Sequence, residues 1–191
     1  DVIKSYEEWK QIDSYDLIYS DEDLFLWNIN PLESLNDYFD EEASYYTMIS
    51  ITRKNTAEAS LIYNIKDDIY ISAMKGEGAM IEKEKLRASN STSNMTRFIC
   101  DNDLISNNII KMNHYERYDS GSIVRDALKL INGEIDFMLI DNFDFIRYQA
   151  LYLICREASL IVELRRNNND NRWIFIASKA KIFNNIFQLI K

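Results

Sequence analysis

Glycine and proline are so scarce in this chain that each one marks a place where the backbone needs special geometry. There are four glycines, at positions 76, 78, 121 and 133, and a single proline, Pro31. Glycine takes positive φ without steric cost and proline has a fixed φ, so both residues are typical of turns and element ends. We therefore treat these five positions as boundaries between predicted elements.

The segments between these boundaries begin as strands and end as alternating helices and strands. Segments rich in β-branched and aromatic residues predict strands, and apolar residues spaced three and four apart predict helices. Strands are predicted at 17–19, 24–29, 45–52, 58–65, 68–74, 135–140, 160–164 and 173–177, and helices at 2–12, 122–132, 146–158 and 179–190. This order predicts an α/β fold of stacked layers of sheets and helices.

Composition excludes several classes of protein. The hydrophobic fraction of 47% excludes a chain that is disordered throughout, and the net charge of −9 disfavours a nucleic-acid partner. No apolar run reaches the ~18 residues that span a bilayer, and nothing resembles a signal peptide, so no membrane association is expected. Cys100 and Cys155 with a single histidine make neither a disulfide scaffold nor a histidine-based zinc site, and we expect a cytoplasmic protein.

Four short motifs, in a fixed order, point to a known family. Residues 27–36 read WNINPLESLN, residues 71–79 read ISAMKGEGA, residues 120–122 and 132–136 read SGS and NGEID, and residues 156–158 read REA. These motifs resemble, in order and spacing, those of the inositol monophosphatase family of magnesium-dependent, lithium-sensitive phosphatases. All four glycines and Pro31 fall on positions of the family pattern.

The resemblance implies the layered α/β sandwich of the sugar-phosphatase fold, with an antiparallel sheet, a second, mixed sheet and helices between them. It also implies a homodimer, as is common in that family. It extends from about residue 17 onward, so we expect one domain over 1–191 that lacks the family's N-terminal helices. Its antiparallel-sheet half is expected over roughly 1–115 and its α/β half over 116–191.

The resemblance also implies a magnesium site, and it identifies the residues at the ligand positions. Asp21 and Glu22 align with the family's paired glutamates, and Asn30 and Glu33 with the two aspartates of its proline motif. Magnesium prefers oxygen ligands, chiefly carboxylates, and Asn30 supplies an oxygen without a charge. Leu35 stands where the family has a threonine hydroxyl.

Arg147 stands where the family has a further metal-binding aspartate, ten residues before Glu157. A permanent cation there repels a metal ion, but a guanidinium also pairs well with phosphate oxygens. Asp144 is an alternative ligand three residues earlier. We therefore single out Ser34, Gly121, Ser122 and Arg147 as candidate phosphate or ligand contacts.

Two principal hypotheses of function follow. In the first, the protein has a degenerate metal site, is weak or inactive as a phosphatase, and binds a phosphorylated small molecule or a protein partner. In the second, it is a working magnesium-dependent phosphomonoesterase acting on inositol phosphate or a related sugar or nucleotide monophosphate. A structural subunit that pairs with an active homologue is a third reading. The side chain of Arg147 discriminates the first two: beside Glu33 it closes the two-metal chemistry, whereas turned to solvent it leaves room for Asp144.

Overall fold

A computed structural model of the chain describes residues 25–33, 44–54, 56–91, 94–111, 114–118, 121–141, 143–166 and 173–189. The predicted segments at 2–12 and 17–19 lie outside these residues, as do Asp21, Glu22, Ser34 and Leu35.

The first sheet is a six-stranded antiparallel meander whose spatial order follows the chain. Its strands are β1 (Leu26–Glu33), β2 (Tyr46–Arg53), β3 (Thr56–Asn64), β4 (Ile69–Met74), β5 (Gly78–Ile81) and β6 (Glu84–Leu86). Alternate residues of β2 are buried, from Tyr46 to Thr52, which is the pattern of a strand with one face on a core. The three strands predicted between 45 and 74 are confirmed within two residues at their ends.

The second sheet is mixed and has the order β10-β11-β9-β7-β8. Its strands are β7 (Thr96–Cys100), β8 (Tyr115–Arg117), β9 (Phe137–Ile140), β10 (Ile161–Arg166) and β11 (Trp173–Ser178). β9 pairs with β7 in parallel and with β11 in antiparallel, and all four of its residues are buried. The change from one sheet to the other falls between Leu86 and Thr96.

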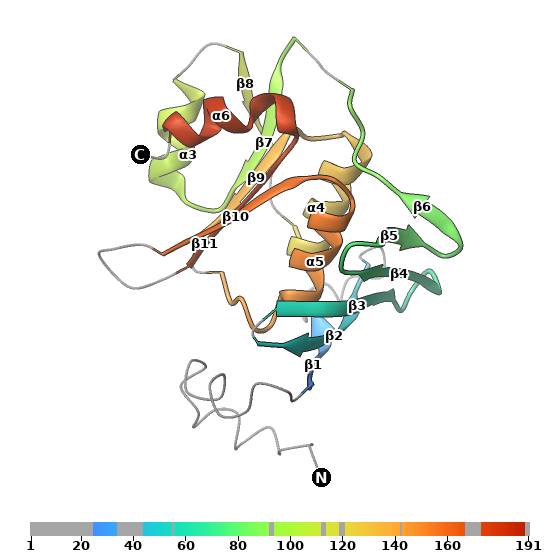
Figure 1. Cartoon of the computed structure of the whole chain (residues 1–191). Helices are drawn as coiled ribbons and strands as arrows, with labels where there is room; N and C mark the ends of the chain where they lie inside the picture. The colour runs from blue at the N-terminus through green and yellow to red at the C-terminus, as the bar shows by residue number, and fades with distance from the viewer. Residues whose placement is uncertain are drawn as a thin grey trace.

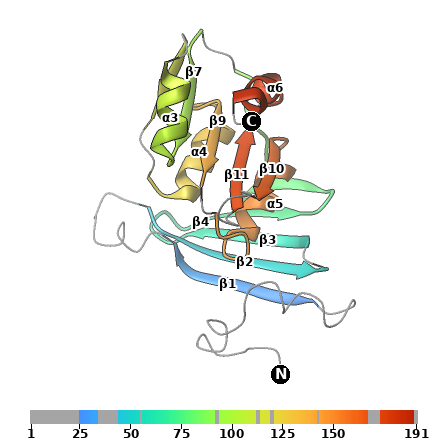
Figure 2. The ribbon, with the colours of Figure 1, turned by 90° about the vertical axis from the view of Figure 1, so that its left-hand side faces the viewer.

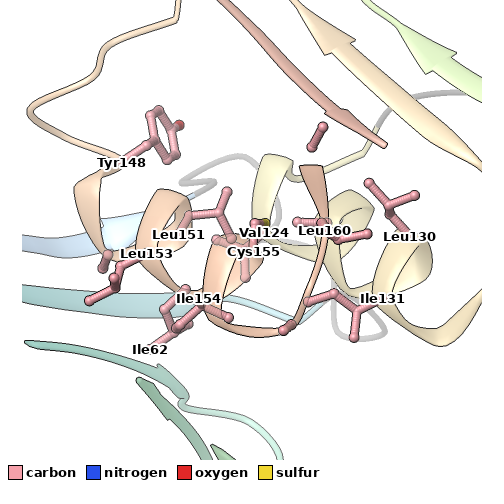
Figure 3. Packing of buried hydrophobic residues seen from close by; sticks show 14 of the residues in the cluster. Ile62, Val124, Leu130, Ile131, Tyr148, Leu151, Leu153, Ile154, Cys155 and Leu160 are labelled. Carbon is pink, nitrogen blue, oxygen red and sulfur yellow. The ribbon is translucent and has the colours of Figure 1, made fainter. Parts of the chain in front are cut away.

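Helices fill the space between the two sheets and cover the far side of the second (Figures 1 and 2). They are α3 (Asp103–Ile110), α4 (Ile123–Asn132), α5 (Gln149–Glu157) and α6 (Ala180–Leu189). α4 and α5 share one buried cluster with both sheets, in which Ile62 of β3 and Ile154 of α5 lie (Figure 3). Ile109 of α3 and Ile186 of α6 belong to a second cluster, on the other face of the mixed sheet. The predicted α/β layering is confirmed.

Gly133 ends α4 in the way that its position in the sequence predicts. Its φ is 85° and its N–H donates to the carbonyl of Leu130, which is the left-handed cap that glycine adopts without strain. Ser122 begins the same helix, and its hydroxyl accepts a hydrogen bond from the N–H of Arg125 at 3.3 Å. The helix therefore ends at Gly133 and begins just after Gly121, two of the positions that the sequence identified as boundaries.

The first strand differs from its prediction. We expected a strand that ends at Asn30 and a polar turn from Leu32, but β1 continues through Pro31 to Glu33. The pairing with β2 shifts register between Asn30 and Glu33, because β1 is an edge strand that accommodates proline at a bulge. The outward side chains of this segment, including Trp27 and Ile29, are more than half exposed.

The described helices are all too short or too polar to cross a lipid bilayer. The two cysteines are buried and unbridged, as the sequence predicts.

Candidate ligand site

The bulge in β1 directs two polar side chains to the inner face of the first sheet. Asn30 is inward by the ordinary alternation of the strand, and Glu33 is inward because the register shift moves it by one position. Their exposed fractions are 9% and 2%. A buried carboxylate is costly unless it is paired or hydrogen-bonded, so its partners define the site.

Glu33 is held by the first residue of the α4 cap. The hydroxyl of Ser122, itself 1% exposed, donates to Oε2 of Glu33 at 2.6 Å. The same oxygen of Ser122 accepts from the N–H of Arg125. One hydroxyl thus joins the N-terminus of α4 to the bulge in β1 by two hydrogen bonds, one of them to a charged group.

Asn30 is held by the residue that precedes α5. In the amide orientation that satisfies both of its groups, Asn30 accepts from Nε of Arg147 at 3.1 Å and donates to the carbonyl of Leu32 at 3.3 Å. The Arg147 guanidinium also lies over the ring of Tyr148, 5.5 Å from its centroid. Although Arg147 is exposed as a residue, its side chain therefore reaches the inner end of the bulge.

Asp144 caps the turn that leads into α5 and does not take the place of Arg147. Its Oδ1 accepts the backbone N–H of Arg147 at 3.1 Å, and the residue is exposed. Arg147 thus bonds through its side chain to Asn30 of the β1 motif and through its backbone to Asp144.

The pKa values of two tyrosines, Tyr148 and Tyr46, are affected by the charge of Glu33 and by nearby arginines. Burial raises the pKa of Tyr148 to about 12, and the negative charge of Glu33 adds to the rise while Arg147 opposes it. Burial also raises the pKa of Tyr46, where a hydrogen bond with Ser44 and then the Arg125 charge act against the rise and Glu33 reinforces it. The charges of Glu33 and Arg147 thus both act on Tyr148, and those of Glu33 and Arg125 both act on Tyr46.

The start of α5 is fixed on the first sheet by a polar network. The side-chain amide of Asn28 donates to Oε1 of Gln149 at 3.4 Å and to the hydroxyls of Thr52 and Ser50 at 3.2 and 3.5 Å. Gln149 is the first residue of α5, so this network anchors the helix directly after Arg147.

The other end of α5 is fixed to the turn between β4 and β5. The two carboxylate oxygens of Glu157 accept from the backbone N–H groups of Gly76 and Gly78, both at 2.9 Å. Both glycines have positive φ, 81° and 98°, which directs their N–H groups to one carboxylate. α5 is therefore pinned at both ends, and the position of Arg147 is set by the fold.

Of the candidate residues in the described part of the chain, the structure brings together Asn30, Glu33, Ser122 and Arg147. Gly121 has a different part: its N–H donates to the buried carboxylate of Asp126 at 3.1 and 3.3 Å and so closes the loop before α4. Asp21, Glu22 and Ser34 lie outside the described residues, and their assignment as ligands stays a prediction.

These described residues do not fit a magnesium ion. Magnesium takes six oxygen ligands in near-octahedral order, and no group of three or more His, Cys, Asp or Glu side chains within the described ranges gathers to bind a metal. Asn30 and Glu33 already bind Arg147 and Ser122.

Sequence reasoning missed two residues of this site, Arg125 and Tyr148. The Arg125 side chain folds back over Gly121: a Cβ added there would lie 2.9 Å from the guanidinium carbon. One signal was available, because Arg125 lies three residues after Ser122 on a predicted helix and so on the same face. Tyr148 is buried, and the charges of Glu33 and Arg147 act on its hydroxyl group.

Comparison with known proteins agrees with the fold and the motif order. No protein-family model matches the chain. Curated relatives include two proteins named Nus factor SuhB from Buchnera aphidicola. One, from the strain of Acyrthosiphon pisum, is 25% identical over 173 residues, which are 81% of this chain and 64% of that protein. The other, from the strain of Schizaphis graminum, is 24% identical over 183 residues, 90% of this chain and 68% of that protein. The chain thus spans about two thirds of their length.

Solved structures with the same fold include inositol monophosphatases. That from Anabaena (Nostoc) sp. matches with a TM-score of 0.74 and 16% identity over 90% of this chain and 73% of that one. The extragenic suppressor protein SuhB from Bartonella henselae matches with a TM-score of 0.72 and 20% identity over 87% and 72%. The curated relatives, the shared fold and the order of the motifs agree with the resemblance of this chain to the inositol monophosphatase family.

Proposed function

We propose that this chain is an inositol-monophosphatase-like protein that binds a phosphorylated small molecule and hydrolyses it weakly or not at all. The observation that supports the proposal is the hydrogen bond from Nε of Arg147 to Asn30 at 3.1 Å. It brings a permanent cation to the motif whose aspartates bind metal in the family.

The positive charge of Arg147 would weaken the binding of a magnesium ion at this position. Two unit charges 4 Å apart interact by about 4 kcal/mol at an effective dielectric of 20, so a guanidinium and a divalent ion repel by about 8 kcal/mol. Asn30 offers an amide oxygen where a carboxylate would attract the ion. A bound metal ion would lower the pKa of the attacking water molecule. Because the repulsion opposes metal binding, it also opposes this activation of water.

The names of similar proteins suggest what else the site could serve. Several structural neighbours are named inositol monophosphatase, whereas both curated relatives above are named Nus factors. A role in binding another protein is therefore the second candidate, and it is compatible with little or no turnover.

The test is phosphate release from inositol 1-phosphate, fructose 1,6-bisphosphate and 3′-phosphoadenosine 5′-phosphate, each with magnesium and with EDTA. We expect release within threefold of the enzyme-free rate under both conditions. Arg147→Asp is measured in parallel, and Arg156→Asp is its matched control, because Arg156 is an exposed arginine at the opposite end of α5.

Magnesium-dependent turnover by the parent protein, abolished by EDTA, would overturn the proposal and support the phosphomonoesterase hypothesis. Turnover that appears only in Arg147→Asp would support the proposal, because it would assign the missing activity to the guanidinium.

A further inference from the structure

Both acidic and basic residues are connected to the β1 bulge by hydrogen bonds. Glu33 and Asp144 carry negative charges, and Arg125 and Arg147 carry positive ones. Contacts link all four to the bulge or to its neighbours: Glu33 through Ser122 to the N–H of Arg125, and Asn30 through Arg147 to Asp144. A cluster of carboxylates demands a divalent cation, whereas this set has no such demand.

Arg147 has hydrogen-bonding capacity left for a ligand. A guanidinium carries five N–H donors, and Asn30 accepts one of them, from Nε. Within the described ranges no carboxylate forms an ion pair with Arg147, although Arg97, Arg117 and Arg165 each have one. The Nη groups of Arg147 form a planar fork of donors, a geometry that matches two oxygens of a phosphate.

The guanidinium is also held in place before any ligand arrives. Asn30, on the first sheet, accepts a hydrogen bond from the guanidinium, and the Tyr148 ring lies beside it. The helix that follows, α5, is fixed at one end by the hydrogen bonds of Asn28 and at the other by those of Glu157. A preorganised donor loses less conformational entropy on binding than a free surface arginine does.

Resting on the proposed function, we propose that Arg147 takes the electrostatic place of a divalent cation, so that this site binds a phosphate group without magnesium. The ligand class is a small phosphomonoester or inorganic phosphate, held by the Nη groups of Arg147 with Arg125 as the second positive charge.

The test uses the full chain with inorganic phosphate as the probe. Binding is measured once in buffer that contains EDTA and once in buffer that contains about 5 mM magnesium. Isothermal titration measures the affinity, and thermal unfolding measures stabilisation by each ion alone. We expect phosphate to bind with the same affinity, within about twofold, in both buffers, and we expect magnesium alone to leave the unfolding midpoint unchanged.

Variants assign the binding to the guanidinium. Arg147→Asp is expected to weaken phosphate binding at least tenfold, Arg147→Lys to weaken it partially, and the control Arg156→Asp to leave it unchanged. Circular dichroism checks that each variant folds. If Arg147→Asp does not fold, the inference is tested by the phosphate affinity of Arg147→Lys and by the magnesium dependence of phosphate binding in the parent protein.

Three outcomes overturn the inference: no phosphate binding, phosphate binding that needs magnesium, or unchanged affinity in Arg147→Asp. Binding that needs magnesium without phosphate release would overturn this inference alone, whereas magnesium-dependent phosphate release would overturn the proposed function. The two failures are therefore distinguishable.

Discussion

The hydroxyl of Ser122 donates to the buried carboxylate of Glu33 across 89 residues of sequence, at 2.6 Å. This contact ties the first turn of α4 to the bulge of β1, and it supplies a hydrogen-bond donor to a buried charged group. The relationship makes Ser122 both a helix cap and a part of the candidate site.

Ser122→Ala is expected to lower the free energy of unfolding by about 2–3 kcal/mol, because it removes a hydrogen bond to a buried charge and a cap together. Urea denaturation measures the loss. Ser122→Thr keeps the hydroxyl and should retain most of the stability. A loss below about 0.5 kcal/mol in the alanine variant would mean that the contact contributes little.

Glu157→Gln is expected to destabilise the fold by about 1–2 kcal/mol, because a neutral amide has one acceptor oxygen for the two N–H groups of Gly76 and Gly78. Chemical denaturation of this variant is compared with Glu134→Gln, a change at an exposed glutamate. Equal stability of the two variants would contradict the clamp that we assign to Glu157.

Asp136→Asn is expected to cost about 3–5 kcal/mol, because the amine of Lys179 lies 2.7 Å from the Asp136 carboxylate and both side chains are 7% exposed. Removing the carboxylate leaves the lysine charge buried with only neutral acceptors, such as the carbonyl of Ser91. Breaking the more exposed pair of Arg165 and Glu163 by Glu163→Gln should cost less than about 1 kcal/mol. Similar losses in the two denaturation curves would contradict this difference.

Tyr148 is expected to ionise last among the tyrosines for which a shift is resolved. Its pKa of about 12 in the folded protein lies above the ordinary value of 10.0, so the folded state holds this proton more tightly than the unfolded state does. The resulting stability is complete below pH 10 and is lost as the pH rises from 10 towards 12. Ultraviolet titration of the parent and of Tyr148→Phe checks this: the variant should lack the most alkaline step. An unchanged titration curve would assign that step to another tyrosine.

The repeating patterns of the sequence carry most of the fold. The meander from β2 to β4 and the helices α4, α5 and α6 follow from alternation and helical spacing, which are local properties. β7 was missed although it lies near the centre of the second sheet, because its five residues pair in parallel with β8 and β9, which lie far along the chain.

The sequence predicts the residues of the candidate site that lie in motifs of fixed spacing. It does not predict the residues whose position depends on a local irregularity of the backbone. The order of the motifs in the sequence is sufficient to identify Asn30, Glu33, Ser122 and Arg147. Neither the bulge that turns Glu33 inward nor the fold of Arg125 over Gly121 has a signature in the sequence, because both depend on how separate elements meet.

The bulge at Pro31 has a second consequence, for solubility. β1 is an edge strand whose free side carries no partner among the described strands, and an exposed edge with apolar neighbours such as Trp27 and Ile29 is a template for aggregation. Pro31 has no N–H to offer an incoming strand, and the register shift beside it interrupts the row of donors and acceptors. The same irregularity that turns Glu33 inward therefore also blocks the growth of the sheet from one molecule to the next.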